Sequence, residues 1–430
     1  MARRKVAHKH PKPPVAPPPR NWNHLALFLL VAVFLLGAIV RFSNLDVALR
    51  SPDEKIYTSQ AQVVLEGGVR GMRAVVGSFL RRPELWSYPP PNRVGYTFLL
   101  AAAMKLTGSA DPAIGSYLSC LVSILTLGAA ILLGLRFLGS WITVFGALFL
   151  AVFPPELAIA RRCWSDALVG LGGVAMLYFA LEIWAGAKKW PPYVLLPLAG
   201  SIAVLIKETS VLIYGSCLLA AFWAVAVRNR NFKHAAMLAG AAAGGALAGT
   251  ALLALTTGGV DVPFEIIMNQ VRSNAANTYA LEYASGPGYL LLLALERLSP
   301  VTLVLALLAM IATTAAPWVP WLSGIRSHRL LAWLTIANLA VYMVVPHWLN
   351  LRYASATFAP LCLFAGVGAY GLFGMAREKL PAQLRVAAAT VGIAVIGLSA
   401  AADYQRFEKA FVRALNLDLS VKMVIRATDE

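Results

Sequence analysis

The chain has 430 residues, of which 59% are hydrophobic and only 13% are charged. A soluble domain is typically about 45–50% apolar and about 25% charged, so this composition excludes an ordinary soluble domain. The net charge of +17 is explained by cytoplasmic loops and anionic lipid headgroups rather than by nucleic acid, so we expect membrane lipids and no nucleic acid as partners. Four cysteines without a C-x-x-C pattern argue against a disulfide framework.

The first apolar run, residues 24–42, follows a basic, proline-rich tail at residues 1–23. Such a tail is typical of an extended segment without a fold of its own. No small-residue cleavage site follows the apolar run, which continues into Arg41-Phe42-Ser43-Asn44. We therefore predict an uncleaved anchor that leaves the tail in the cytoplasm and carries the chain outward.

A long outer loop is predicted at residues 43–112. Within it, residues 53–67 indicate a short helix that Ser51 and Asp53 can cap and that Gly67-Gly68 can end. Residues 94–107 are apolar but too few to cross a bilayer, which takes about 20 residues. We expect this second segment to lie in the interface.

The positions of the basic clusters support this topology. If residues 94–107 do not cross the membrane, the later clusters fall on the cytoplasmic side, as the positive-inside rule expects. The fold class is then an all-α polytopic membrane domain over residues 24–402, with an outer C-terminal tail at 403–430. We predict about eleven spans, near 24–42, 113–136, 140–158, 166–186, 191–206, 208–227, 235–256, 288–314, 329–346, 353–375 and 385–402.

Ionisable residues gather at the outward ends of these spans, where they are costly and therefore functional candidates. Each also has a structural interpretation. Asp53 and Glu54 suit a helix start, Lys207 suits a surface ion pair with Glu208, and Arg352 suits a side chain that reaches the interface. Arg161 and Arg162 suit headgroup anchors. Because five separate loops, including a larger outer loop predicted at residues 257–287, bring such groups to one face, a site is the stronger interpretation.

The same residues resemble the motifs of a known family. Asp53-Glu54-x-x-Tyr57-x-x-x-Ala61, directly after the first span, resembles the first-loop motif of GT-C glycosyltransferases. The subgroup is the one related to protein O-mannosyltransferases and lipid A aminoarabinose transferases. Further matches are similar in order and spacing: Tyr88-Pro89-Pro90, where family members often have His before the prolines, Arg162 to Asp166, Lys207, and Arg352-Tyr353 followed by Pro360.

The resemblance implies a GT-C-like fold and a transferase of the bacterial cytoplasmic membrane. Its donor would be a polyprenyl-phosphate sugar, and its acceptor a lipid, glycan or protein of the cell envelope on the extracytoplasmic face. Asp53 would act as general base, with Glu54 and Asp166 as further catalytic residues. Asp53 and Asp166 are also candidate ligands of a divalent cation. The candidate donor and phosphate ligands are Arg162, Lys207, Arg352, Tyr57 and Tyr353.

A transporter or flippase of a lipid-linked or anionic substrate is the alternative from another class. It predicts charged residues near the midpoints of spans and paired broken helices in two halves. Most ionisable residues here lie at outward ends, and only Glu296-Arg297 is predicted to lie deeper. A structural subunit without activity would tolerate any change at Asp53.

Overall fold

The computed structural model describes residues 23–315, 326–344, 349–413 and 418–429. Within these ranges the chain is helical, and the only β-type pairing is an isolated bridge between Asn350 and Ser420. The predicted cytoplasmic tail lies outside the described residues, except for Asn23. The helices are α1 His24–Ser43, α2 Pro52–Arg81, η1 Pro83–Leu85, α3 Val94–Thr107, α4 Ala113–Phe137, α5 Ser140–Val152, α6 Pro154–Ala160, α7 Asp166–Trp184, α8 Pro191–Ile206, α9 Ser210–Phe222, η2 Trp223–Arg228, α10 Phe232–Thr257, α11 Val262–Ala275, α12 Thr278–Tyr283, α13 Tyr289–Leu298, α14 Pro300–Thr314, α15 Arg326–Val344, η5 Leu351–Thr357, α16 Phe358–Lys379, α17 Ala382–Phe407, η6 Glu408–Arg413 and α18 Val421–Asp429.

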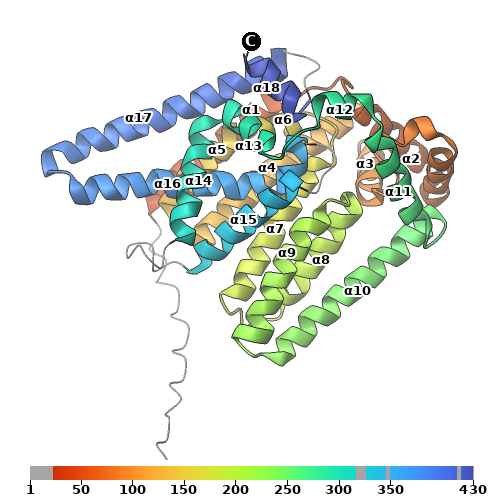
Figure 1. Cartoon of the computed structure of the whole chain (residues 1–430), viewed down its shortest axis with the longest axis horizontal. Coiled ribbons are helices and arrows are strands. Elements are labelled where there is room, and N and C mark those ends of the chain that lie inside the picture. The colour runs from red at the N-terminus through yellow and green to blue at the C-terminus, as the bar shows by residue number, and fades with distance from the viewer. Residues whose placement is uncertain (1–22, 316–325, 345–348, 414–417, 430) are drawn as a thin grey trace, which may run out of the picture.

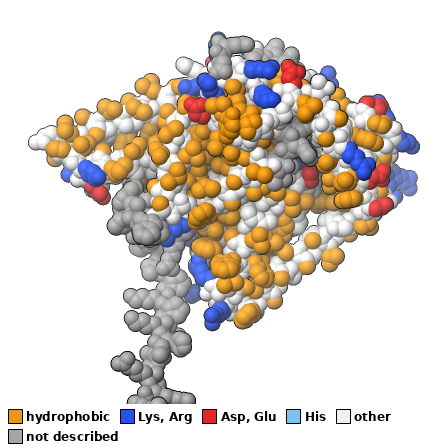
Figure 2. Space-filling view, in the orientation of Figure 1, with side chains coloured by type: hydrophobic (Ala, Val, Ile, Leu, Met, Phe, Trp, Pro, Cys, Tyr) orange, Lys and Arg blue, Asp and Glu red, His pale blue; other side chains and the backbone are white. Residues whose placement is uncertain are grey.

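The fold is that of a polytopic helical membrane protein. In the described part, seven helices are long and apolar enough to cross a membrane, or eight if the bent pair α5–α6 forms one span. The other predicted spans coincide with shorter apolar helices such as α8 and α14, so the count of eleven is not confirmed. Figure 2 shows hydrophobic side chains over much of the molecule, with charged ones mostly toward its edges.

The first outer loop is built on α2, and its start is fixed locally. Ser51 caps the helix, its side chain accepts a hydrogen bond from the Glu54 amide, and Glu54 accepts one from the Ser51 amide in return. Helical geometry breaks at Gly68, where φ is 54° and ψ is −131°, so the predicted helix end is at the right place. A second helical arm, which the sequence did not predict, then runs to Arg81.

The close approach of the two arms of α2 depends on Gly71. A Cβ atom at this position would lie 2.3 Å from the backbone oxygen of Val63 on the first arm. Only glycine therefore permits this contact without a backbone shift. The kink and the contact together hold the outer loop in a folded-back shape beside α3.

A broken helix carries the chain to the end of the bundle where α2 begins. α5 and α6 meet at an angle of 56°, because Phe153-Pro154 interrupts the helical hydrogen bonds. The buried Arg41 of α1 donates to the freed carbonyl oxygens of Ala151 at 3.1 Å and Leu150 at 3.3 Å. These bonds satisfy backbone groups that lipid could not, and α6 then leads into the turn at 161–165.

The predicted span 288–314 is likewise broken, at Ser299, into α13 and α14. Glu296 and Arg297 form a pair near the end of α13, with side chains that are 48% and 43% exposed. The depth of this pair in the membrane stays a prediction. Pro300 begins α14 and marks the break, because proline suits the first turn of a helix and not its interior. α17 continues beyond residue 402 through η6 to Arg413.

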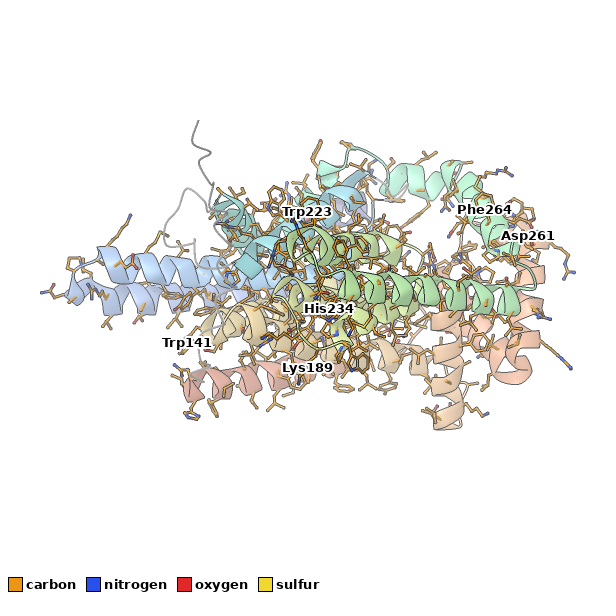
Figure 3. The ribbon with its side chains drawn as sticks, turned by 90° about the horizontal axis from the view of Figure 1, so that it is seen from below. Trp141, Lys189, Trp223, His234, Asp261 and Phe264 are labelled. Carbon is orange, nitrogen blue, oxygen red and sulfur yellow. The ribbon has the colours of Figure 1, made fainter. Side chains whose placement is uncertain are left out.

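The bundle core is formed by α5, which packs against α16 and α1, and by α7, which packs against α8, α4 and α9. Figure 1 shows α17 extending away from this core on one side, and α2, α3 and α11 gathered at the opposite side. α10 runs beside α8 and is mostly exposed. In Figure 3 His234 lies near the start of α10, and Asp261 and Phe264 lie beyond its other end.

Candidate active site

Four segments far apart in the sequence meet at one end of the bundle. They are the start of α2, the turn 161–165 before α7, the turn 207–209 between α8 and α9, and the short helix η5. Each ends or begins a helix, so its side chains are held by rigid elements on both sides. Within the described residues, three ion pairs connect these segments and the first residue of α7, and a fourth pair adds Arg93, which precedes α3. These pairs contain most of the residues that the sequence singles out.

Asp53 and Arg352 form the first pair, with 2.7 Å between Oδ2 and Nη2. Their side chains are 20% and 11% exposed, so this pair stands at the edge of the cluster where a substrate can reach it. The Arg352 guanidinium also lies 5.1 Å from the Trp164 ring. Its Nε atom is buried and makes no hydrogen bond in the described part of the chain, so one donor is open for a ligand.

Glu54 and Arg162 form the second pair, with 2.9 Å between Oε1 and Nη1. Glu54 is fully buried, and the same oxygen accepts hydrogen bonds from the amide and hydroxyl of Ser51. The helix-start interpretation of Glu54 therefore matches its geometry, and the ion pair is added to it. Glu54 therefore joins the start of α2, which carries Asp53, to the turn before α7.

Asp166 and Lys207 form the third pair, with 2.5 Å between Oδ1 and Nζ, and both are buried. The Lys207 ammonium also lies 4.2 Å from the centre of the Tyr353 ring. Burial lowers the pKa of Lys207 to about 8, although Asp166 opposes the change. Because the Arg352 guanidinium lies 5.8 Å from the centre of the same ring, Tyr353 connects the first and third pairs.

Arg93 and Glu208 form the fourth pair, which the sequence analysis missed. Arg93 binds both carboxylate oxygens of Glu208, at 3.0 Å and 2.5 Å, and donates to the Tyr57 hydroxyl at 2.6 Å. That hydroxyl lies 3.1 Å from the Ser165 hydroxyl. Burial raises the pKa of Tyr57 to about 12, so the phenol stays protonated at neutral pH. Arg93 follows Pro89-Pro90-Pro91 at the start of α3, and this position was the available signal.

The predicted site residues are therefore brought together, with different partners than expected. Lys207 pairs with Asp166, and Glu208 pairs with Arg93, so the expected surface pair between Lys207 and Glu208 does not form. Arg161 lies 3.8 Å from Asp46 and donates to backbone oxygens, including that of Phe411. Its role in the described structure is to join loops behind the site.

The metal prediction concerns Asp53 and Asp166. Each carboxylate has a cationic partner, Arg352 for Asp53 and Lys207 for Asp166. In the described ranges, no group of three or more His, Cys, Asp or Glu side chains is arranged to hold a metal ion. Binding of a cation at this pair would require both carboxylates to exchange partners, and it stays a prediction.

The end of the bundle opposite the site carries basic residues. α7 begins in the cluster and α8 ends in it, so their other ends lie away from it. Lys189 lies between those other ends, and Arg228 donates there to the carbonyl oxygen of Trp184 at 2.9 Å. Lys189 and Arg228, which belong to the clusters that the topology prediction uses, therefore lie at the end of the bundle opposite the four ion pairs.

No protein-family model and no curated protein sequence matches the chain. Solved structures do match. ArnT from Cupriavidus metallidurans in the apo state has a TM-score of 0.54, with 16% identity over 94% of this chain and 77% of that chain. ArnT bound to undecaprenyl phosphate gives 0.54 with 17% identity over the same shares. The apo Archaeoglobus fulgidus oligosaccharyltransferase gives 0.61, with 11% identity over 93% of this chain and 57% of that chain.

These matches define the class of fold. ArnT and the archaeal oligosaccharyltransferase are GT-C glycosyltransferases, and this chain shares their transmembrane architecture over nearly its whole length. The chain is thus an integral membrane protein with the GT-C fold, as the first-loop motif and the order of later motifs predict.

Proposed function

We propose that the protein is a membrane glycosyltransferase that moves a sugar from a polyprenyl-phosphate donor to an acceptor on the extracytoplasmic face. The proposal is supported by the fold, since the ArnT structure named above binds undecaprenyl phosphate. It is supported more directly by the side chains at the end of the bundle. The cationic groups of Lys207 and Arg352 both contact the ring of Tyr353, and the part-exposed carboxylate of Asp53 pairs with Arg352.

The charge change of the reaction explains the need for these cations. A sugar linked through a phosphodiester carries one negative charge, and the departing polyprenyl phosphate carries up to two. Cations fixed beside the phosphate therefore stabilise the transition state more than the ground state. Arg352 supplies planar donors that match phosphate oxygens, and Lys207 supplies a point charge. Arg162, held between Glu54 and the Trp164 ring, strengthens the positive potential from behind.

Asp53 is the proposed general base. The acceptor hydroxyl or amine attacks the anomeric carbon, the bond from that carbon to the phosphate oxygen breaks, and Asp53 takes the acceptor proton. In the resting site Arg352 pairs with Asp53 and occupies its carboxylate. A donor phosphate competes for Arg352, so binding of the donor frees Asp53 for proton removal. Asp166 would hold Lys207 in place, and Tyr57 would support the site through Arg93.

The close pairing of Asp53 with Arg352 at a part-exposed edge is the observation that carries the proposal. We expect Asp53→Asn to lower sugar transfer by about 10²–10⁴-fold, because the amide cannot accept the proton. The measurement uses purified protein in liposomes with radiolabelled undecaprenyl-phosphate sugars and envelope acceptors. Asp261→Asn, at an exposed position of another loop, is the matched control. Full transfer by a normally folded Asp53→Asn protein would disprove the base assignment.

A further inference from the structure

The C-terminal segment at residues 418–429 folds back onto the candidate site, and we name it the C-terminal strap. It consists of an extended start and the helix α18. Leu419, Val421 and Val424 are fully buried, and α18 packs against α13 and α12. Figure 1 shows α18 at the same end of the bundle as α12 and α13. The strap is therefore part of the folded domain at the end where the ion pairs lie.

The strap binds the backbone that leads into η5. The Leu351 amide donates to the Leu419 oxygen at 2.8 Å, and the Val421 amide donates to the Leu349 oxygen at 3.1 Å. The Leu349 amide donates in turn to the Ala284 oxygen at 2.7 Å. Backbone hydrogen bonds thus connect three segments, which are the loop after α10, the residues before η5 and the strap.

One side-chain contact connects the strap to Arg352. The Asn350 amide nitrogen donates to the Ser420 hydroxyl at 3.3 Å, and the Asn350 amide oxygen accepts from the Arg352 backbone amide at 3.1 Å. Asn350 is 2% exposed and Ser420 is fully buried, so water does not compete for these bonds. Asn350 caps η5, and Ser420 sets the orientation of that cap.

The strap also contacts the loop that follows α10. The Tyr279 hydroxyl of α12 donates to Asp418 at the start of the strap. Lys422 on α18 donates to the Ser285 hydroxyl at 2.9 Å. The loop that follows α10 and the turn that carries Arg352 therefore share the strap as a common contact.

We propose that the C-terminal strap is a positioning element of the transfer site, in which Ser420 acts through Asn350 to direct Arg352 toward the donor phosphate and Asp53. This role rests on the proposed function. If the strap served only stability, loss of its contacts would lower the melting temperature and the amount of folded protein. If it positions Arg352, loss of the contact weakens donor binding while the fold persists.

The first test is kinetic. We expect Ser420→Ala to reduce kcat/KM for an undecaprenyl-phosphate sugar about fivefold, mainly through KM, because one buried hydrogen bond is lost. Thr428→Ala is the control, since Thr428 bonds only to carbonyl oxygens of its own helix, α18. An equal loss in both variants, or a loss that follows only the fraction of folded protein, would overturn the proposal.

A double-mutant cycle tests whether Arg352 mediates the effect. If Ser420 acts through Arg352, Ser420→Ala has no further effect once Arg352→Ala is present. Additive losses would show that the strap acts by another route and would refute the positioning role.

The second test does not depend on sugar transfer. Val421→Pro removes the amide that binds Leu349 but suits the first position of α18, where proline is favoured. We expect faster amide hydrogen exchange at 349–353 in this variant and unchanged exchange in α7, while Val421→Ala, which keeps the amide, leaves 349–353 protected. Unchanged exchange in Val421→Pro would refute the positioning role. Absence of transfer by the wild-type protein would refute only the proposed function.

Discussion

The Lys207 ammonium lies between a carboxylate and an aromatic ring, in the turn that joins α8 to α9. Burial lowers its pKa most, Asp166 raises it, and the nearby Arg93 and Arg352 lower it further, to about 8. The protonated form prevails below this pH and is the form that attracts a phosphate. Small pH changes above neutrality therefore alter the charge of the site.

We predict that kcat/KM for the lipid-linked donor falls as pH rises through about 8, because Lys207 loses its proton and its attraction for the phosphate. Lys207→Arg keeps a protonated group and should move this fall to higher pH, even if the maximal rate is lower. The measurement is a pH profile of kcat/KM for both proteins. Identical alkaline limbs would assign the ionisation to another group.

The sequence predicted which residues belong to the candidate site better than it predicted which of them form ion pairs with each other. The place of ionisable residues at the predicted outward ends of spans pointed to Asp53, Asp166, Lys207 and Arg352. Their partners are more than 40 residues away in each case, and no periodic pattern encodes such a contact. Arg93 was missed for this reason, because its importance becomes visible only when Glu208 folds against it.

At the scale of elements, α2 determines the shape of the outer loop. Its start could be predicted from Ser51, which caps the helix, whereas Asp53, the other predicted cap, lies inside the helix and pairs with Arg352. Its second arm could not, because the contact across the kink depends on the missing side chain of Gly71. The breaks in α5–α6 and α13–α14 coincide with Pro154 and Pro300, which begin the second helix of each pair. The predicted spans ran across them because the two flanking runs together have the length of a span.

We predict that Gly71→Ala destabilises the protein by about 1–3 kcal/mol, because the new Cβ would force the two arms of α2 apart. Gly67→Ala is the matched control, since no atom lies within 4 Å of a Cβ there. Thermal unfolding in detergent measures both. A control variant that unfolds as early as Gly71→Ala would contradict the contact argument.

At the scale of the molecule, the two ends of the bundle differ in chemistry. One end holds the four ion pairs, and the other holds Lys189 and the residues around it. Length and hydrophobicity predicted the class of fold, since a long apolar helix satisfies its own backbone groups in lipid. The number of spans could not be fixed this way, because the described apolar stretches of α8, α14 and α15 are shorter than a typical span.

We predict that cysteines at positions 189 and 261 react with a membrane-impermeant maleimide from opposite sides, with Asp261→Cys labelled from outside intact cells. Both native side chains are exposed (Figure 3), and all four native cysteines are buried, so the background is low. Labelling of both positions from the same side would refute the proposed topology.

The balance of the four ion pairs has a consequence for turnover. Each carboxylate of the cluster is matched by a cation in the described structure, so an arriving lipid brings the uncompensated charge. In the proposed reaction that charge rises from one on the donor to two on the spent carrier. Because electrostatic attraction grows with charge, the spent carrier is the tighter ligand. The enzyme would then be inhibited by its own product, and its rate would depend on how quickly the membrane recycles the lipid phosphate.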